Sequence, residues 1–190
     1  MSNKYKILDQ RGLNYLTLTV VGWIDIFSRK KYRDLIIDSL KYCQENKGLH
    51  VHGYVIMTNH IHLVVRASGE QTLSEVIKDF KSFTATSILK DLPQSSESRK
   101  KWLMFLFNYF AKKNKRKGKH QFWQTDNHPI ELYSQKVIQQ KLNYIHKNPV
   151  RANWVEMPQH YIYSSASNYL EQGKGILEIE ILESFYNFDG

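Results

Sequence analysis

The sequence LHVHGYVIMTNHIHLVVR, residues 49–66, is typical of two β-strands joined by a tight turn at residues 57–59. In an extended strand, alternate side chains point to the same face of the sheet. His60 and His62 are therefore expected on one face, with Ile61 and Leu63 on the buried face. Two neutral imidazoles side by side provide half of a divalent-metal site. The simpler alternative is a half-exposed strand whose two histidines bind no ligand.

The segments on either side of this pair predict an α+β domain. Thr72, followed three residues later by Glu75, is typical of a capping box that opens a helix. Ser134 is a candidate N-cap, and Pro149 is expected to end the helix that follows it. The order of elements indicates an α+β sandwich with an antiparallel sheet. In chain order, periodicity predicts a strand over 14–21, a helix over 31–46, strands over 49–57 and 60–66, a helix after Thr72, a helix over 98–112, a strand over 120–132 and a helix over 134–147.

The chain is strongly basic, with 27 lysines and arginines against 18 acidic residues and a net charge of +9. Clustered cations suit a phosphate backbone, because neutralising it releases condensed counterions. A solvated basic loop without a partner is the alternative. Phe122 and Trp123 lie close behind the cluster and are expected either to stack on unpaired bases or to pack in the core. The cluster consists of Lys112, Lys113, Lys115, Arg116, Lys117 and Lys119.

Cysteine content and hydropathy favour a soluble cytoplasmic protein. The only cysteine is Cys43, which excludes an internal disulfide framework and fits a reducing compartment. No apolar run approaches the length of a membrane span, and the N-terminus lacks a signal-peptide core. We therefore expect no membrane partner.

Tyr144 and Asn148 lie four residues apart in the predicted last helix, and hence on one helix face. A phenol and a carboxamide on one face can both reach a metal-bound phosphate, the phenol as a nucleophile and the amide oxygen as a third ligand. The alternative is a packed aromatic side chain and an asparagine that only caps the helix end. Periodicity alone does not distinguish the two.

Three blocks in order resemble the REP-associated tyrosine transposases, which are single-tyrosine HUH transposases, named for their histidine–hydrophobic–histidine motif. The resemblance runs from about residue 14 to residue 170, with similar order and spacing. The histidine pair alone is a weak signal, whereas the three blocks together are specific. They are YVIMTNHIHLVV at residues 54–65, YIHKNPVRA at 144–152 and YIYSS at 161–165.

The resemblance implies a ferredoxin-like α+β domain that cuts single-stranded DNA at hairpin-bearing ends. By this resemblance His60 and His62 bind Mg²⁺ or Mn²⁺, and Asn148 completes the metal site. Tyr144 attacks the scissile phosphate to form a 5′-phosphotyrosine link and free a 3′-hydroxyl. The resemblance also implies a monomer or a homodimer. It spans an expected domain over 1–170, followed by an acidic tail over 171–190.

Several candidates remain beside this set. Arg151 and the basic cluster are expected to contact the DNA backbone. His50-Val51-His52 is a second His-x-His, interpreted as surface or packing, and Tyr161 and Tyr163 are less favoured nucleophiles. Residues 125–129, TDNHP, depart from the basic or aromatic residues of many relatives, so DNA contacts there are in doubt. Two other functions stay open, a non-cutting DNA-binding protein that keeps the fold and a phosphoesterase that uses water.

Overall fold

The fold is built on a four-stranded antiparallel sheet with strand order β2-β3-β1-β4. It is known from a computed structural model, which describes residues 6–171 and 175–182. The predicted α+β class and antiparallel sheet are therefore confirmed. The strands are β1 (Asn14–Thr19), β2 (Leu49–Ile56), β3 (His60–Ala67) and β4 (Ile130–Glu131).

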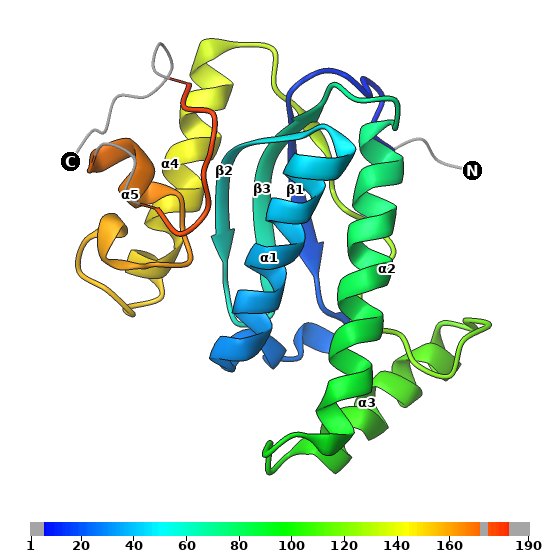
Figure 1. Cartoon of the computed structure of the whole chain (residues 1–190). Helices are drawn as coiled ribbons and strands as arrows, with labels where there is room; N and C mark the ends of the chain where they lie inside the picture. The colour runs from blue at the N-terminus through cyan, green and yellow to red at the C-terminus, as the bar shows by residue number, and fades with distance from the viewer. Residues whose placement is uncertain (1–5, 172–174, 183–190) are drawn as a thin grey trace.

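Helices cover both faces of this sheet, as Figure 1 shows. Two of them, α1 and α2, pack on the face to which Ile61 and Leu63 point, and both side chains are fully buried. The capping box predicted at Thr72 opens α2. On the other face lies α4, and α3 projects away from the sheet (Figure 1). The helices are α1 (Lys30–Lys47), α2 (Leu73–Asp91), α3 (Lys100–Lys113), α4 (Gln135–Arg151) and α5 (Ala166–Leu170).

A glycine lets α4 approach the sheet closely. A Cβ atom at Gly53 in β2 would lie 2.7 Å from Cδ2 of Leu142 in α4. A second contact lies further along the helix, where Nε2 of His146 is 2.8 Å from Oγ of Ser165. That hydroxyl also accepts a hydrogen bond from the backbone N–H of Tyr54 in β2, at 2.9 Å. The position of α4 is thus set by buried contacts with β2.

The end of α4 differs from the sequence prediction. The helix begins after Ser134, whose side chain caps it as expected, but it continues through Pro149 to Arg151. A proline removes its own N–H donor and its ring crowds the carbonyl of the residue four positions earlier, but the bonds that follow it are intact. The backbone N–H of Ala152 donates to the carbonyl of Asn148, at 3.0 Å.

The predicted strand over residues 120–132 is mostly irregular. Only Ile130 and Glu131 form β4, and Trp123 makes an isolated bridge with Val20. Phe122 and Trp123 are 3% and 5% exposed and pack with Phe27. Of the two expected roles of this aromatic pair, core packing is therefore correct, and neither ring is available to stack on bases.

The C-terminal segment over residues 175–182 lies along β2. The backbone N–H of Glu180 donates to the carbonyl of Val51, and Leu177 is fully buried. The rest of the predicted acidic tail, residues 172–174 and 183–190, lies outside the described residues. Among the helices of the described part of the chain, none is both long enough and apolar enough to cross a membrane.

The buried imidazole of His146 should make stability depend on pH. Burial lowers the pKa of His146 from 6.5 to about 3, so the unfolded chain binds more protons than the folded one between these values. The free energy of unfolding should therefore be highest above pH 6.5 and fall as the pH drops. At pH 4.5 the loss should be about 3 kcal/mol. Urea unfolding at pH 7.5 and 4.5 measures it, and H146Q should show a smaller difference.

Candidate metal and nucleophile site

His60 and His62 lie side by side at the start of β3. Their ring centroids are 4.7 Å apart, as the period-two pattern predicts. In the sheet, His60 pairs with Thr19 and His62 with Thr17 of β1. The pair therefore belongs to a central strand, whose backbone holds both side chains in place.

Hydrogen bonds fix the proton of His60. Its Nδ1 is 2.6 Å from Oδ1 of Asn59. An amide oxygen can only accept a hydrogen bond, so Nδ1 of His60 carries the proton and donates it. The lone pair of His60 is therefore on Nε2, the atom available to a cation.

His62 is held through the same nitrogen by β1. Its Nδ1 lies 2.8 Å from the hydroxyl of Tyr15 and 3.0 Å from that of Thr17. Its Nε2 is buried and has no hydrogen-bond partner among the described residues. A hydroxyl that accepts from Nδ1–H leaves the Nε2 lone pair free, which is the tautomer that a metal ligand requires.

Burial keeps both imidazoles neutral at pH 7. Burial is the largest cause, followed by the charges of His60 and Lys141, and together they lower the pKa of His62 to about 3. The pKa of His60 is lowered by burial as well. Burial raises the pKa of the Tyr15 phenol, so this group stays protonated beside His62. Neutral imidazoles with free lone pairs are the form that binds a divalent cation.

Tyr144 reaches the histidine pair from α4. Its ring centroid is 5.4 Å from that of His62, and the two rings meet edge to face. The side chain is 40% exposed, so a phosphodiester in solution can reach its hydroxyl. The guanidinium of Arg151 lies 5.2 Å from the Tyr144 ring centroid. A phenol, two imidazoles and a guanidinium thus lie close together.

Asn148 lies one helical turn after Tyr144 in α4, as its spacing predicts. Its side-chain Nδ2 is buried without a hydrogen-bond partner among the described residues. Within those residues, no group of three His, Cys, Asp or Glu side chains could hold a metal ion. A carboxamide binds a cation through its oxygen and not through its nitrogen, so Asn148 as the third ligand stays a prediction from the sequence.

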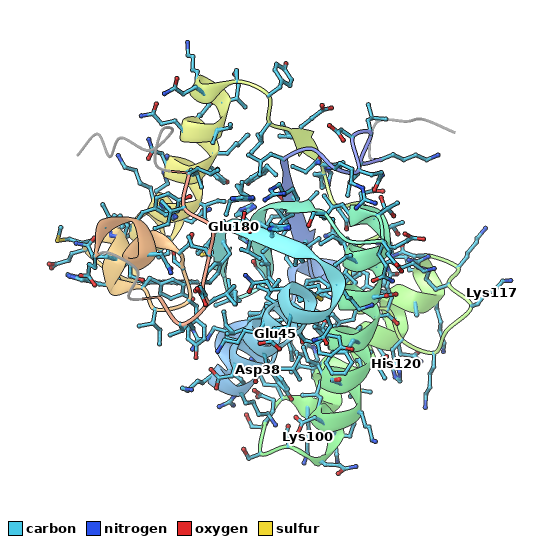
Figure 2. All side chains as sticks on the ribbon, turned by 45° about the horizontal axis from the view of Figure 1, so that its top comes forward. Asp38, Glu45, Lys100, Lys117, His120 and Glu180 are labelled. Atoms are coloured by element: carbon cyan, nitrogen blue, oxygen red, sulfur yellow. The ribbon has the colours of Figure 1, made fainter. Side chains whose placement is uncertain are left out.

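The predicted DNA-contacting cations fall into two places. Arg151 lies at Tyr144, whereas the loop after α3 lies at the opposite edge of the molecule from α4 (Figures 1 and 2). The side chains of the basic cluster are all exposed. Three of them, Lys115, Arg116 and Lys117, line a hollow of about 730 Å³ together with Lys78 and Lys81 of α2. This second region suits phosphate but is separate from the histidine pair.

The competing candidates are occupied by structural contacts. His50 and His52 both contact Glu180 of the C-terminal segment, and the Nδ1 of His52 is 2.9 Å from its carbonyl oxygen. The buried hydroxyl of Tyr161 donates to the carbonyl of Ile56, at 2.7 Å. That of Tyr163 donates to Asp34, also at 2.7 Å. Neither tyrosine is poised as a nucleophile.

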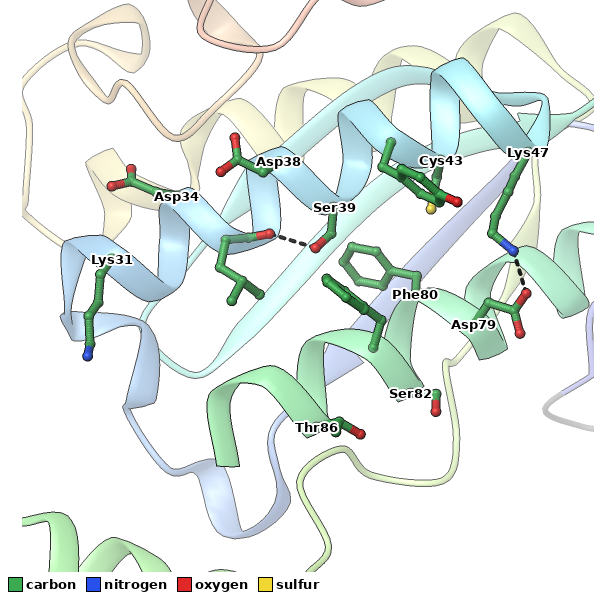
Figure 3. A pocket seen from close by; sticks show the side chains of 13 residues that line it. Lys31, Asp34, Asp38, Ser39, Cys43, Lys47, Asp79, Phe80, Ser82 and Thr86 are labelled. Atoms are coloured by element: carbon green, nitrogen blue, oxygen red, sulfur yellow. Dashed lines mark hydrogen bonds and ion pairs between the residues drawn. The ribbon is translucent and has the colours of Figure 1, made fainter. Parts of the chain in front are cut away.

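A larger hollow than the one beside the basic loop lies elsewhere, between α1 and α2. It measures about 980 Å³, and Phe80 lines it between the two helices (Figure 3). An ion pair between Lys47 and Asp79, drawn in Figure 3, closes one end. The two helices cover the sheet face opposite to the histidines. This hollow therefore does not belong to the candidate site.

The chain was compared with known proteins. Residues 24–124, just over half of the chain, match a family model described as "Transposase IS200 like". A solved structure of a REP-associated tyrosine transposase bound to a REP hairpin is similar over 90% of this chain and 87% of its own, with a TM-score of 0.60 and 14% identity. A putative transposase from Deinococcus radiodurans covers 81% of this chain and 96% of its own, at 13% identity and a TM-score of 0.43. No curated protein matches. The first structure shows a shared fold, and the family match includes both histidines.

Proposed function

The chain belongs to the family of IS200-like transposases, and we propose that it cuts and rejoins single-stranded DNA through a covalent tyrosine intermediate. The observation that carries the proposal is the position of Tyr144. This half-exposed tyrosine lies against His62, whose buried Nε2 has no partner among the described residues.

The proposed reaction is one in-line displacement at phosphorus. The hydroxyl of Tyr144 loses its proton and its oxygen forms a bond to the scissile phosphorus. The bond from phosphorus to the 3′-oxygen breaks, and that oxygen takes up a proton to become a 3′-hydroxyl. The DNA downstream stays attached to the enzyme as a 5′-phosphotyrosine. Attack by another 3′-hydroxyl on this link reverses the chemistry and joins two strands without an external energy source.

His60, His62 and Asn148 would hold Mg²⁺ or Mn²⁺. When bound, the cation stabilises the charge that develops on the phosphate oxygens. Asn59, Tyr15 and Thr17 orient the imidazoles. Arg151, beside the Tyr144 ring, adds a fixed positive charge at the point where the phosphate must sit.

The proposed substrate is single-stranded DNA that carries a hairpin. The basic surface supports a nucleic-acid partner, and the similar solved transposase was bound to a REP hairpin. The test uses a hairpin oligonucleotide labelled at its 3′ end, mixed with the protein and Mn²⁺ and separated under denaturing conditions. The 3′ label should move with the protein, and a 5′ label should leave on a fragment with a free 3′-hydroxyl. DNA binding without a protein-linked label would favour the non-cutting alternative. Cleavage without a protein-linked label would favour a water nucleophile.

The basic cluster should set the salt dependence of DNA binding. Replacing all six of its residues with glutamine should reduce the slope of log K against log salt by about 4, since each contact with a single strand contributes about 0.7. Affinity at low salt should fall more than a hundredfold. Filter binding over a range of NaCl concentrations measures both, with the exposed Lys41, Lys90 and Lys136 changed to glutamine as the control. An unchanged slope would remove the cluster from the interface.

Loss of the Tyr15 hydroxyl should weaken metal binding without emptying the site. In Y15F, Nδ1 of His62 keeps only Thr17 as a partner, so the imidazole is less firmly oriented. Loss of such a supporting hydrogen bond typically lowers metal affinity 10- to 100-fold. Mn²⁺ titration followed by electron paramagnetic resonance measures the dissociation constant. Y163F is the control, because its hydroxyl binds Asp34 away from the site.

A further inference from the structure

An exposed row of aromatic side chains runs along α3. Trp102, Phe105 and Tyr109 are 53%, 64% and 46% exposed. Their spacing of three and four residues places them on one face of the helix. The opposite face is buried in the core through Leu103 and Phe107. The helix therefore has two apolar faces, and within the described residues the protein covers only one.

The segment that carries this row also carries the net charge of the chain. Residues 98–125 contain nine lysines and arginines and no acidic residue. The whole chain has 27 basic and 18 acidic residues, so the remainder has 18 of each and is neutral. Lys101, Lys112 and Lys113 of α3 are exposed beside the aromatic row, and Nζ of Lys113 lies 5.9 Å from the Tyr109 ring centroid.

We propose that the α3 aromatic row, Trp102, Phe105 and Tyr109, is a stacking platform for unpaired DNA bases, and that the flanking lysines hold the phosphates between them. This inference rests on the proposed function, since it takes single-stranded DNA as the substrate. Rings on a positively charged surface suit unpaired bases, because every base has a π-face and every link a negative charge. In a fully paired stem the base faces are covered by the neighbouring bases, so only the phosphates are available.

The dimensions of the row fit one strand. A helix rises 1.5 Å per residue, so the three rings are about 4.5 Å and 6 Å apart along the axis. Stacked bases in a duplex strand are about 3.4 Å apart. Each ring can therefore take one base of a strand that is moderately stretched. In Figure 1, α3 projects away from the sheet.

Charge argues against a second copy of the chain as the occupant. A symmetric interface on this row would bring two identical patches together. Each patch carries lysines and no acidic residue along α3, so the two would repel at close range. The negative partner that the row lacks is supplied by a phosphate backbone.

The test compares two hairpins that differ only in a single-stranded thymidine extension. The triple variant W102A/F105A/Y109A should bind the extended hairpin at least tenfold more weakly than the wild type, while both proteins bind the blunt hairpin equally. F83A is the matched control, because Phe83 is 61% exposed on α2 and lies outside the row. In the wild type, the extended hairpin should quench tryptophan fluorescence, and W102F should lose that quenching.

Other results would overturn the platform. Equal loss of affinity for both hairpins, or no loss for either, removes the preference for unpaired bases. A wild-type dimer that the triple variant dissociates would assign the row to a second copy. Binding of the wild type to phosphatidylserine vesicles as tightly as to the extended hairpin would assign the row to a membrane surface. The covalent test is separate, since the triple variant should still form the adduct at saturating DNA. Absence of the adduct in the wild type overturns the proposed function but not the binding comparison.

Discussion

The Y144F variant is expected to form no covalent protein–DNA adduct while binding hairpin DNA as the wild type does. Phenylalanine keeps the ring that packs edge to face against His62 but lacks the oxygen that bonds to phosphorus. The two other tyrosines of the C-terminal blocks, Tyr161 and Tyr163, use their hydroxyls in the fold. Neither of these two hydroxyls is therefore free to replace that of Tyr144. Denaturing electrophoresis of the 3′-labelled hairpin measures the loss.

Y133F provides the matched control for this variant. Tyr133 is 85% exposed and lies just before α4, so its loss tests whether any accessible phenol is captured. Adduct formation in Y133F should equal that of the wild type. An adduct of normal yield in Y144F, mapped to another residue by mass spectrometry, would show that Tyr144 is not the nucleophile. It would overturn the proposed mechanism.

Replacing His62 with alanine should lower the rate of cleavage by a factor of 100 or more. Charge stabilisation by a bound cation is worth several kcal/mol in the transition state, and each 1.36 kcal/mol is a factor of ten in rate. Hairpin binding in the presence of EDTA should be unchanged, since the phosphate contacts lie on other residues. Single-turnover cleavage with Mn²⁺ measures the rate, and Mn²⁺ affinity should fall in parallel.

H50A is the control for the second His-x-His. His50 contacts Glu180 and Ser68 and should contribute nothing to cleavage. A hundredfold loss of the cleavage rate in H50A, or a wild-type rate in H62A, would show that His60 and His62 are not the metal-binding pair. H62A also removes a buried side chain, so circular dichroism must show that the variant is folded at the assay temperature.

Local periodicity predicts the relative positions of the candidate site residues, whereas their roles come from the family resemblance. The period of two placed His60 beside His62, and the period of 3.6 placed Asn148 one turn after Tyr144. Tyr15 and Thr17 were missed, although their alternation in β1 put them on one face. Their role depends on which residue of β3 pairs with Thr17. The register between two strands cannot be predicted from the sequence of either strand alone.

Tertiary context explains the remaining differences. Pro149 predicted a helix end, but it tolerates a helical position because the turn that follows keeps its own hydrogen bonds. Trp123 lies close behind a run of cations, yet its indole N–H donates to Thr84 and its ring is buried. A neighbouring charge in sequence does not show which way a side chain points.

The contact of Gly53 with Leu142 has a consequence for how such a site evolves. The proposed ligands belong to β3 and α4, so the spacing between imidazole and amide depends on how closely the helix rests on the sheet. Small changes in side-chain volume beneath α4 would widen or narrow that spacing while every ligand stays the same. Selection for one cation over another can therefore act on core residues that never touch DNA.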